Sequence, residues 1–190
     1  HEVAVRDRIQ RVGHRAVEAE RLGGRGAVDR KRGSRQRRRP ERRFVQPLAR
    51  IGEAAAIARG VDVTGETCPQ YLFLSTDDYA RFGGVIRVNP PVREKENQEP
   101  IWAALKDGTV DMIATDHAPH APAEKTRNDI WTVDCGFPGV ETQMPLMLTE
   151  VSAGRMSISD YVRWSATNPA KIWGLYPRKG VVQAGSQADL

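Results

Sequence analysis

Cysteine and long apolar runs are both scarce in this chain of 190 residues. The two cysteines, Cys68 and Cys135, are too few for a disulfide framework or a thiolate zinc ribbon, so a reducing, cytoplasmic setting is expected. No apolar run reaches the roughly 18 residues that a membrane-spanning helix needs. Residues 1–6 contain neither a hydrophobic signal core nor an initiator Met, so we expect the chain to begin inside something longer.

Lysine and aromatic residues are almost missing from residues 1–50, which contain fifteen arginines, one lysine and one aromatic, Phe44. This segment has 16 of the 29 Lys+Arg and 6 of the 24 Asp+Glu, a net charge of +10, which leaves −5 for residues 51–190. Three interpretations compete: a basic arm for nucleic acid, a disordered tail, or an out-of-frame or mis-bounded reading of a GC-rich gene. Because Phe44 alone could stack on bases, nucleic acid is not expected as a partner. Residues 1–47 are predicted to be disordered or mis-translated.

The rest of the chain alternates between strand-like and helix-like patterns. A strand is predicted to be followed by a loop, a helix and another strand, which favours a parallel α/β array. Predicted strands cover 61–67, 85–88, 110–115 and 179–185, and predicted helices cover 48–60, 95–106 and 140–152. Further predictions are a loop at 68–71, a capped helical turn at 76–79, a helix capped by Ser157 or Ser159, and a short helix capped by Asn168.

The stretch from Asp111 to His120 is the densest group of ionisable residues after an apolar run. Functional groups often lie where a buried strand ends, so Asp116 is a candidate catalytic or metal-binding residue. The alternative is an Asp that caps a turn beside solvated histidines. Asn89 is a candidate substrate-binding amide or part of an ordinary Asn-Pro turn. Residues 135–139 form a glycine-rich turn in which backbone can approach a ligand.

Five short motifs occur in one order and together resemble the cyclic amidohydrolases: dihydroorotase, allantoinase and dihydropyrimidinase/hydantoinase. The resemblance covers about residues 51–190. It implies the C-terminal part of a metal-dependent (β/α)8 TIM-type barrel over residues 48–176, and the start of a small β-domain over 177–190. It also implies a binuclear zinc centre. The motifs are Glu66–Leu72, Asn89–Arg93, Ala114–His120, Gly139–Thr142 and Asn168–Lys171.

The resemblance also implies roles for individual residues. Asp116 matches the last-strand Asp that binds metal and acts as general base and acid. Asn89 and His120 match substrate contacts of the dihydroorotase branch, and the Cys135-Gly136 backbone matches a substrate-gripping loop. Residues 96–102 and 174–180 instead look more like allantoinase or hydantoinase, so the branch stays open.

The chain departs from the family pattern in its metal ligands. The family's His-x-His, carboxylated lysine and two further histidines lie in a part that this chain does not contain. Since catalytic zinc takes at least about three protein ligands, we expect an incomplete fragment that is inactive by itself. The parent is expected to hydrolyse the C–N bond of a small cyclic amide, dihydroorotase-like, as a homo-oligomer without a membrane partner. The alternatives are an allantoinase/hydantoinase-like ureide hydrolase and a catalytically dead assembly homologue.

Overall fold

A three-stranded parallel sheet is the centre of the protein in the computed structural model, which describes residues 43–45 and 59–188. The strands are β1 (Arg43–Val45), β2 (Val63–Thr67) and β3 (Met112–Ile113), in the order β1-β2-β3. Both pairs are parallel, with Phe44 opposite Thr64 and Thr67 opposite Ile113. The predicted parallel array is therefore confirmed, although these strands form an open sheet and not a closed barrel.

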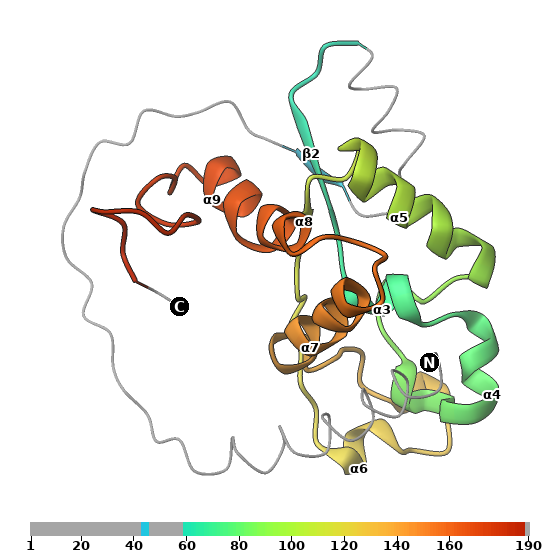
Figure 1. The fold of residues 1–190 in the computed structure, drawn as a ribbon. Helices are drawn as coiled ribbons and strands as arrows, with labels where there is room; N and C mark the ends of the chain where they lie inside the picture. The colour runs from blue at the N-terminus through green and yellow to red at the C-terminus, as the bar shows by residue number, and fades with distance from the viewer. Residues whose placement is uncertain (1–42, 46–58, 189–190) are drawn as a thin grey trace, which may run out of the picture.

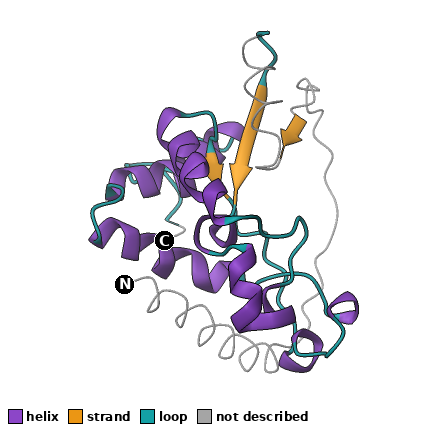
Figure 2. Cartoon of the chain, turned by 90° about the vertical axis from the view of Figure 1, so that its right-hand side faces the viewer, coloured by secondary structure: helices purple, strands orange, loops and turns teal. Residues whose placement is uncertain are grey.

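The helices lie on one side of the strands and beyond the end of β2 (Figures 1 and 2). None of those described is long and apolar enough to cross a membrane. The α-helices are α3 (Pro69–Phe73), α4 (Tyr79–Phe82), α5 (Gln98–Asp107), α6 (Pro122–Lys125), α7 (Gly139–Ser152), α8 (Ile158–Val162) and α9 (Asn168–Ile172). Shorter turns are the 3-10 turns η3 (Thr76–Asp78), η4 (Gly83–Ile86), η5 (Lys95–Asn97) and η6 (Ile130–Thr132), and the π-helical turn η7 (Arg163–Thr167).

The best-predicted helices are those with both an apolar stripe and a stop signal. In α5, Trp102 and Leu105 face the core, and Gly108 ends the helix in a left-handed conformation at φ 84°. The turn at 76–79 is confirmed, with Ser75 as its cap, because the Ser75 N–H donates to Asp78 Oδ2 at 2.8 Å. Likewise Ser157 caps α8, where its Oγ accepts from the Asp160 N–H at 3.0 Å.

Asn168 was predicted to begin a new helix, and this is wrong. The chain continues from α8 through η7 into α9, so Asn168 lies inside one continuous helix. Its side-chain amide instead donates to the carbonyl of Asp111 at 2.7 Å. This bond joins the helix to the residue just before β3, and the Asp111 carboxylate in turn accepts from the Gly65 N–H at 2.9 Å.

Three other local predictions are wrong for physical reasons. Residues 85–88 form the end of η4 and an extended segment, because Arg87 pairs its carbonyl with the Gly136 N–H instead of a neighbouring strand. The predicted loop at 68–71 is mostly α3, since Pro69 occupies the first helical turn, where a missing N–H costs nothing. Residues 179–185 form turns and bends and not a strand. Whether 177–190 begins a separate domain stays a prediction.

The predictions for the N-terminal part fall mostly outside the described residues. The predicted helix at 48–60 lies there, apart from its last two residues, which form a turn. Of the Arg-rich segment 1–47, three residues form β1 and pair with β2.

Two apolar clusters form the described core. The first cluster lies between α5, α7, β3 and the continuous α8–α9 helix, and the second lies around α3, α4 and the extended segment after η4. The first contains Leu72, Trp102, Ala104, Leu105, Val110, Ile113, Met147, Met156 and Trp164. The second contains Cys68, Tyr71, Leu74, Phe82, Ile86, Val88, Val92 and Phe137.

Candidate functional site

Asp116 lies at the carboxyl end of β3 and is exposed to solvent. The backbone stays paired with β2 up to Ala114, whose N–H donates to the Thr67 carbonyl at 2.8 Å. At Asp116 the chain then turns through a positive φ of 44°, a conformation that Asp tolerates better than most residues. The predicted functional carboxylate is therefore presented at the strand end by a change of backbone direction.

The end of β2 places three more ionisable groups near Asp116. Burial raises the pKa of Glu66, and the charge of Asp116 raises it further. Burial, followed by the charge of Asp116, also raises the pKa of the Cys68 thiol to about 12, so this thiol is neutral at pH 7. The pKa of Tyr71 is raised by the same burial, and its hydroxyl donates to the Pro90 carbonyl at 2.9 Å. Sequence reasoning quoted Glu66 and Tyr71 in a motif but assigned them no role in the site.

Residues 134–137, here called the 134–137 loop, bring most of the predicted site residues together. The Gly136 N–H donates to the Arg87 carbonyl at 3.1 Å, two residues before the exposed Asn89. On the other side, Phe137 accepts from the Ala118 N–H at 2.9 Å, two residues after Asp116. Two segments far apart in sequence, 87–89 and 116–118, therefore meet at one loop.

His120 also contacts this loop. Its Nε2 lies 3.0 Å from the Cys135 carbonyl, and its Nδ1 lies 3.6 Å from Glu124 Oε2. The predicted substrate residues His120, Cys135 and Gly136 are thus neighbours. Cys135 is a half-buried free thiol, and its carbonyl makes the contact with His120.

Two glycines allow the close approach of backbone in this region. A Cβ at Gly136, where φ is 145°, would lie 2.4 Å from the Ala118 carbonyl oxygen. A Cβ at Gly139 would lie 2.2 Å from the carbonyl oxygen of Thr115, the residue before Asp116. Since both obstacles are backbone atoms that cannot rotate away, only glycine fits at either position.

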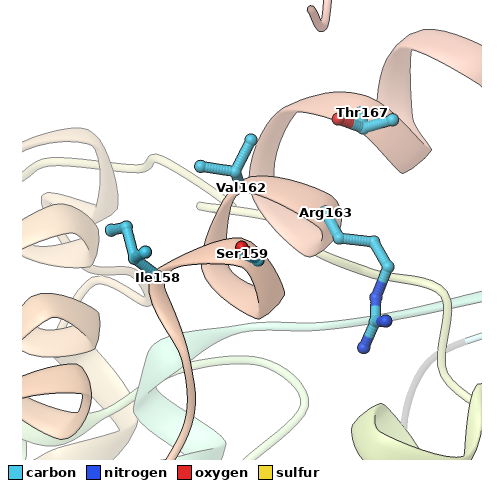
Figure 3. Close-up of a pocket in the computed structure, with 5 residues that line it drawn as sticks. All are labelled: Ile158, Ser159, Val162, Arg163 and Thr167. Carbon is cyan, nitrogen blue, oxygen red and sulfur yellow. The ribbon is translucent and has the colours of Figure 1, made fainter.

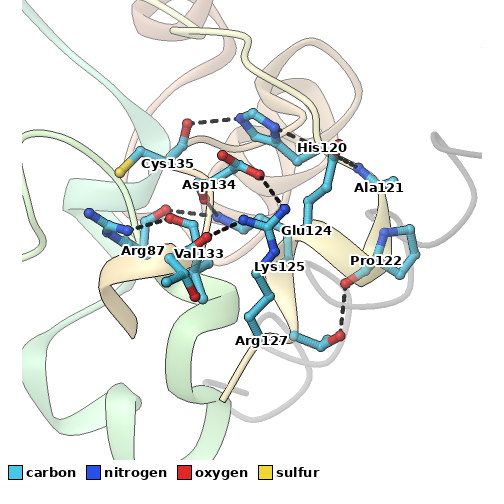
Figure 4. Close-up of polar contacts among 12 residues, drawn as sticks. Arg87, His120, Ala121, Pro122, Glu124, Lys125, Arg127, Val133, Asp134 and Cys135 are labelled. Carbon is cyan, nitrogen blue, oxygen red and sulfur yellow. Dashed lines mark hydrogen bonds and ion pairs between the residues drawn. The ribbon is translucent and has the colours of Figure 1, made fainter. Parts of the chain in front are cut away.

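Lys125 is the residue of this region that sequence reasoning missed. It is 8% exposed, and its ammonium donates to the carbonyls of Arg87 and Asp134, both at 2.8 Å, and of Gly136 at 3.1 Å (Figure 4). Burial lowers the pKa of Lys125 to about 8. No local pattern marks it, because its partners are backbone atoms up to 38 residues away in sequence.

The described residues fit only part of a zinc centre. Asp116 offers a solvent-accessible carboxylate at a strand end, which fits one ligand position. In the described ranges, however, three possible ligand atoms come within 4.8 Å of one another only at His120, Glu124 and Asp134. Glu124 there accepts from the Ala121 N–H at 2.7 Å, and Asp134 lies 3.4 Å from Arg127. This group is stabilised by its own contacts and does not include Asp116.

A surface hollow of about 240 Å³ lies elsewhere, along α8 and η7 (Figure 3). Its lining is a helix flank with one cation, Arg163, which pairs with Asp160 at 2.8 Å. The hollow contains none of the predicted site residues, so the candidate site is the strand-end region and not this hollow. The lining residues are Ile158, Ser159, Val162, Arg163 and Thr167.

A parallel sheet whose carboxyl edge collects ionisable groups and a glycine-rich loop defines an α/β protein of the kind that builds enzyme sites at its strand ends. The chain belongs to the amidohydrolase family, whose model matches residues 52–190. The resemblance to the cyclic amidohydrolases is thereby confirmed.

Similar proteins come from several branches of this group. The chain is 45% identical over 139 residues to a dihydroorotase of Halobacterium salinarum, covering 73% of this chain and 32% of that protein. It is 41% identical over 138 residues to an L-hydantoinase of Paenarthrobacter aurescens, covering 71% and 30%. The solved structure of an L-hydantoinase from Arthrobacter aurescens matches with a TM-score of 0.71 and 38% identity, over 76% of this chain and 34% of that one. The chain thus spans about a third of the length of these relatives.

Proposed function

We propose that this chain supplies the last-strand carboxylate and the substrate-binding loops of a metal-dependent hydrolase that opens the C–N bond of a cyclic amide. The observation that carries the proposal is the convergence at the 134–137 loop. Hydrogen bonds from this loop reach the segments that hold Asn89, Asp116 and His120. The same stretch is 40% or more identical to hydrolases of cyclic amides.

In this proposal Asp116 holds and moves a proton. Zinc bound in the family's manner would lower the pKa of a water molecule and polarise the amide carbonyl, and Asp116 would be one of its ligands. The Asp116 carboxylate takes a proton from the attacking water and returns it to the leaving ring nitrogen. The exposed position of Asp116 at the strand end gives substrate access to this carboxylate.

The remaining residues bind and orient the substrate. Asn89 offers an exposed side-chain amide, with the neighbouring Pro90 held by the Tyr71 hydroxyl. His120 and the Cys135-Gly136 backbone supply polar groups from the opposite segment. Because Asn89 and His120 match the dihydroorotase branch, we infer a dihydroorotase-like substrate. The similarity to hydantoinase structures favours hydantoin-type ureides as the second candidate.

The test uses a chimera, because the described residues provide one ligand of the metal centre. Residues 52–190 replace the matching part of the Paenarthrobacter aurescens L-hydantoinase, whose remaining sequence is expected to supply the other metal ligands. Zinc-loaded chimera is assayed with dihydroorotate, hydantoin and allantoin. We expect turnover, with dihydroorotate as the best substrate. The 190-residue chain alone, loaded with zinc, is expected to turn over none of the three.

Asp116→Asn is the decisive variant in this chimera. It keeps the shape of the side chain but removes its negative charge and proton acceptor, so we expect kcat to fall by roughly a thousandfold or more. Asp77→Asn, an exposed Asp in η3, is the matched control and should leave kcat unchanged. Equal activity of the Asp116→Asn and Asp77→Asn chimeras would refute the role of Asp116. A chimera that retains the fold and zinc but hydrolyses none of the substrates would refute the proposed function.

A further inference from the structure

We propose that Lys125 is a positioning residue that holds the 134–137 loop against the segment leading to Asn89. The inference rests on the proposed function in one respect only, namely that this loop and Asn89 bind the substrate. Lys125 is the last residue of α6 and has no place in the proton transfer described above.

The geometry of the ammonium carries the proposal. An ammonium has three N–H donors, and the Lys125 Nζ has three carbonyl acceptors, at 2.8, 2.8 and 3.1 Å. Two of the three, on Asp134 and Gly136, belong to the loop, and the third, on Arg87, lies two residues before Asn89. One buried cation therefore joins the two sides of the proposed substrate site through charge-assisted bonds.

Further contacts also hold the 134–137 loop and the residues before it against the segment around Arg87. The Gly136 N–H donates to the same Arg87 carbonyl, so Lys125 and Gly136 share one acceptor. The Arg87 guanidinium donates to the carbonyls of Ile130, Trp131 and Val133, just before the loop. The Lys125 ammonium also lies 5.7 Å from the centre of the Phe137 ring. In Figure 4, Arg87, Lys125 and Asp134 lie together, and dashed lines mark the contacts among the residues drawn.

Within the described residues, Lys125 is the side chain that donates to these three carbonyls. The charged or titratable groups near it are Arg87, Asp134 and Cys135. Among them, Arg87 already directs its guanidinium to the carbonyls before the loop. A methionine at 125 would fill a similar volume but leave the three carbonyls without this donor, and an arginine would keep the charge with a planar fork that cannot match three converging acceptors.

Hydrogen exchange in the full 190-residue chain tests the positioning role without reference to catalysis. In Lys125→Met we expect the Gly136 and Ala118 amides to lose roughly tenfold or more of their protection, because the loop that they join is released. Lys125→Arg should lose less. The Asp111 amide, bonded to the Gly65 carbonyl at 2.9 Å, reports on the sheet and should change by less than about twofold. Lys106→Met, at an exposed lysine of α5, is the matched control.

Unchanged protection at Gly136 and Ala118 would overturn the proposal. An equal loss at Asp111 would also overturn it, because Lys125 would then support the fold as a whole and not the loop.

Steady-state kinetics in the chimera supply the second measurement. A loop that positions substrate should affect binding more than proton transfer, so Lys125→Met should raise KM about tenfold with kcat within about twofold, and Lys125→Arg should recover part of the loss. Unchanged KM beside an unchanged Lys106→Met control would overturn the link to substrate. A chimera that is inactive even with Lys125 intact would count against the proposed function, while hydrogen exchange alone would still decide whether Lys125 holds the loop.

Discussion

The first apolar cluster and the 134–137 loop are stabilised in different ways. The cluster consists of large side chains such as Trp102, Leu105 and Trp164, each at most 1% exposed, that pack between helices and sheet. The loop is held mainly through backbone atoms, by a buried ammonium and by amide-to-carbonyl bonds from distant segments. Apolar packing is non-directional, whereas hydrogen bonds to carbonyls fix position and orientation.

The apolar cluster should therefore determine the stability of the whole chain, and the hydrogen bonds should determine the position of the 134–137 loop. Loss of a core side chain should weaken the whole chain and leave the loop geometry intact in the molecules that remain folded. Loss of a loop contact should displace the loop and change the stability of the whole chain much less. Burying the Lys125 charge carries a desolvation cost, which is why burial lowers its pKa. The loop therefore has its defined position at some cost in global stability.

The largest expected effect on stability is in the core. Leu105 is fully buried, so Leu105→Ala removes apolar contacts and leaves a cavity, and should lower the free energy of unfolding by about 2–5 kcal/mol. Urea denaturation followed by circular dichroism measures this change. Ala103→Gly, on the exposed face of α5, is a control for helix propensity and should cost no more than about 1 kcal/mol. Equal losses in the two variants would show that the cluster is not the main source of stability.

The next largest expected effect is a pH dependence of the unfolding free energy that arises from the titration of Lys125. Its pKa falls from 10.5 to about 8 on folding, so between these values the unfolded chain binds more protons than the folded chain. Stability from this group is therefore present above pH 10.5 and is lost as the pH falls through about 8. Relative to Lys125→Met, the wild-type chain should gain about 3 kcal/mol in unfolding free energy from pH 7 to pH 11.

Paired urea titrations at the two pH values measure this gain. Titrations of Cys68 and the tyrosines cancel in the difference between variants. Lys106→Met, compared with wild type in the same way, should show no such slope because Lys106 is exposed. A flat difference for Lys125→Met would mean that the Lys125 charge is not desolvated.

The smallest expected effect lies outside both regions, at the start of α8. Ser157→Ala removes the Oγ that accepts from the Asp160 N–H, and should lower the free energy of unfolding by about 1 kcal/mol. Thermal unfolding measures it, with Ser159→Ala, at the second residue of the same helix, as control. Neither change should alter exchange at the Gly136 amide. If Ser157→Ala released that amide, the separation between placement and stability would fail.

The parts of the fold that could be predicted from the sequence are those determined by near neighbours. The apolar stripe and final glycine of α5, the Ser157 cap and the β-branched run of β2 are all local signals. Where the partner is distant, local patterns gave the wrong element. Val88 is buried like a strand residue, but Arg87 beside it pairs with the amide of Gly136 and not with a strand.

The candidate site also contains residues that local motifs mark in the sequence and one residue whose partners are distant. Asp116, Asn89, His120 and the glycine-rich turn stand out in sequence because of their motifs, and the structure connects their segments through the 134–137 loop. Their roles in catalysis and binding stay predictions. Lys125 could not be found, since one lysine among polar residues carries no signal until three carbonyls converge on it.

The dominance of main-chain contacts in the 134–137 loop affects which substitutions it can accept. His120 and Lys125 contact carbonyls of Cys135, Asp134 and Gly136, and every residue type offers the same carbonyl. Gly136 is fixed by its neighbouring backbone, but the side chain at 135 makes neither of these contacts. Position 135 can therefore be varied to change what the loop presents to a ligand while the loop keeps its place, which makes it a natural site for a focused library in substrate engineering.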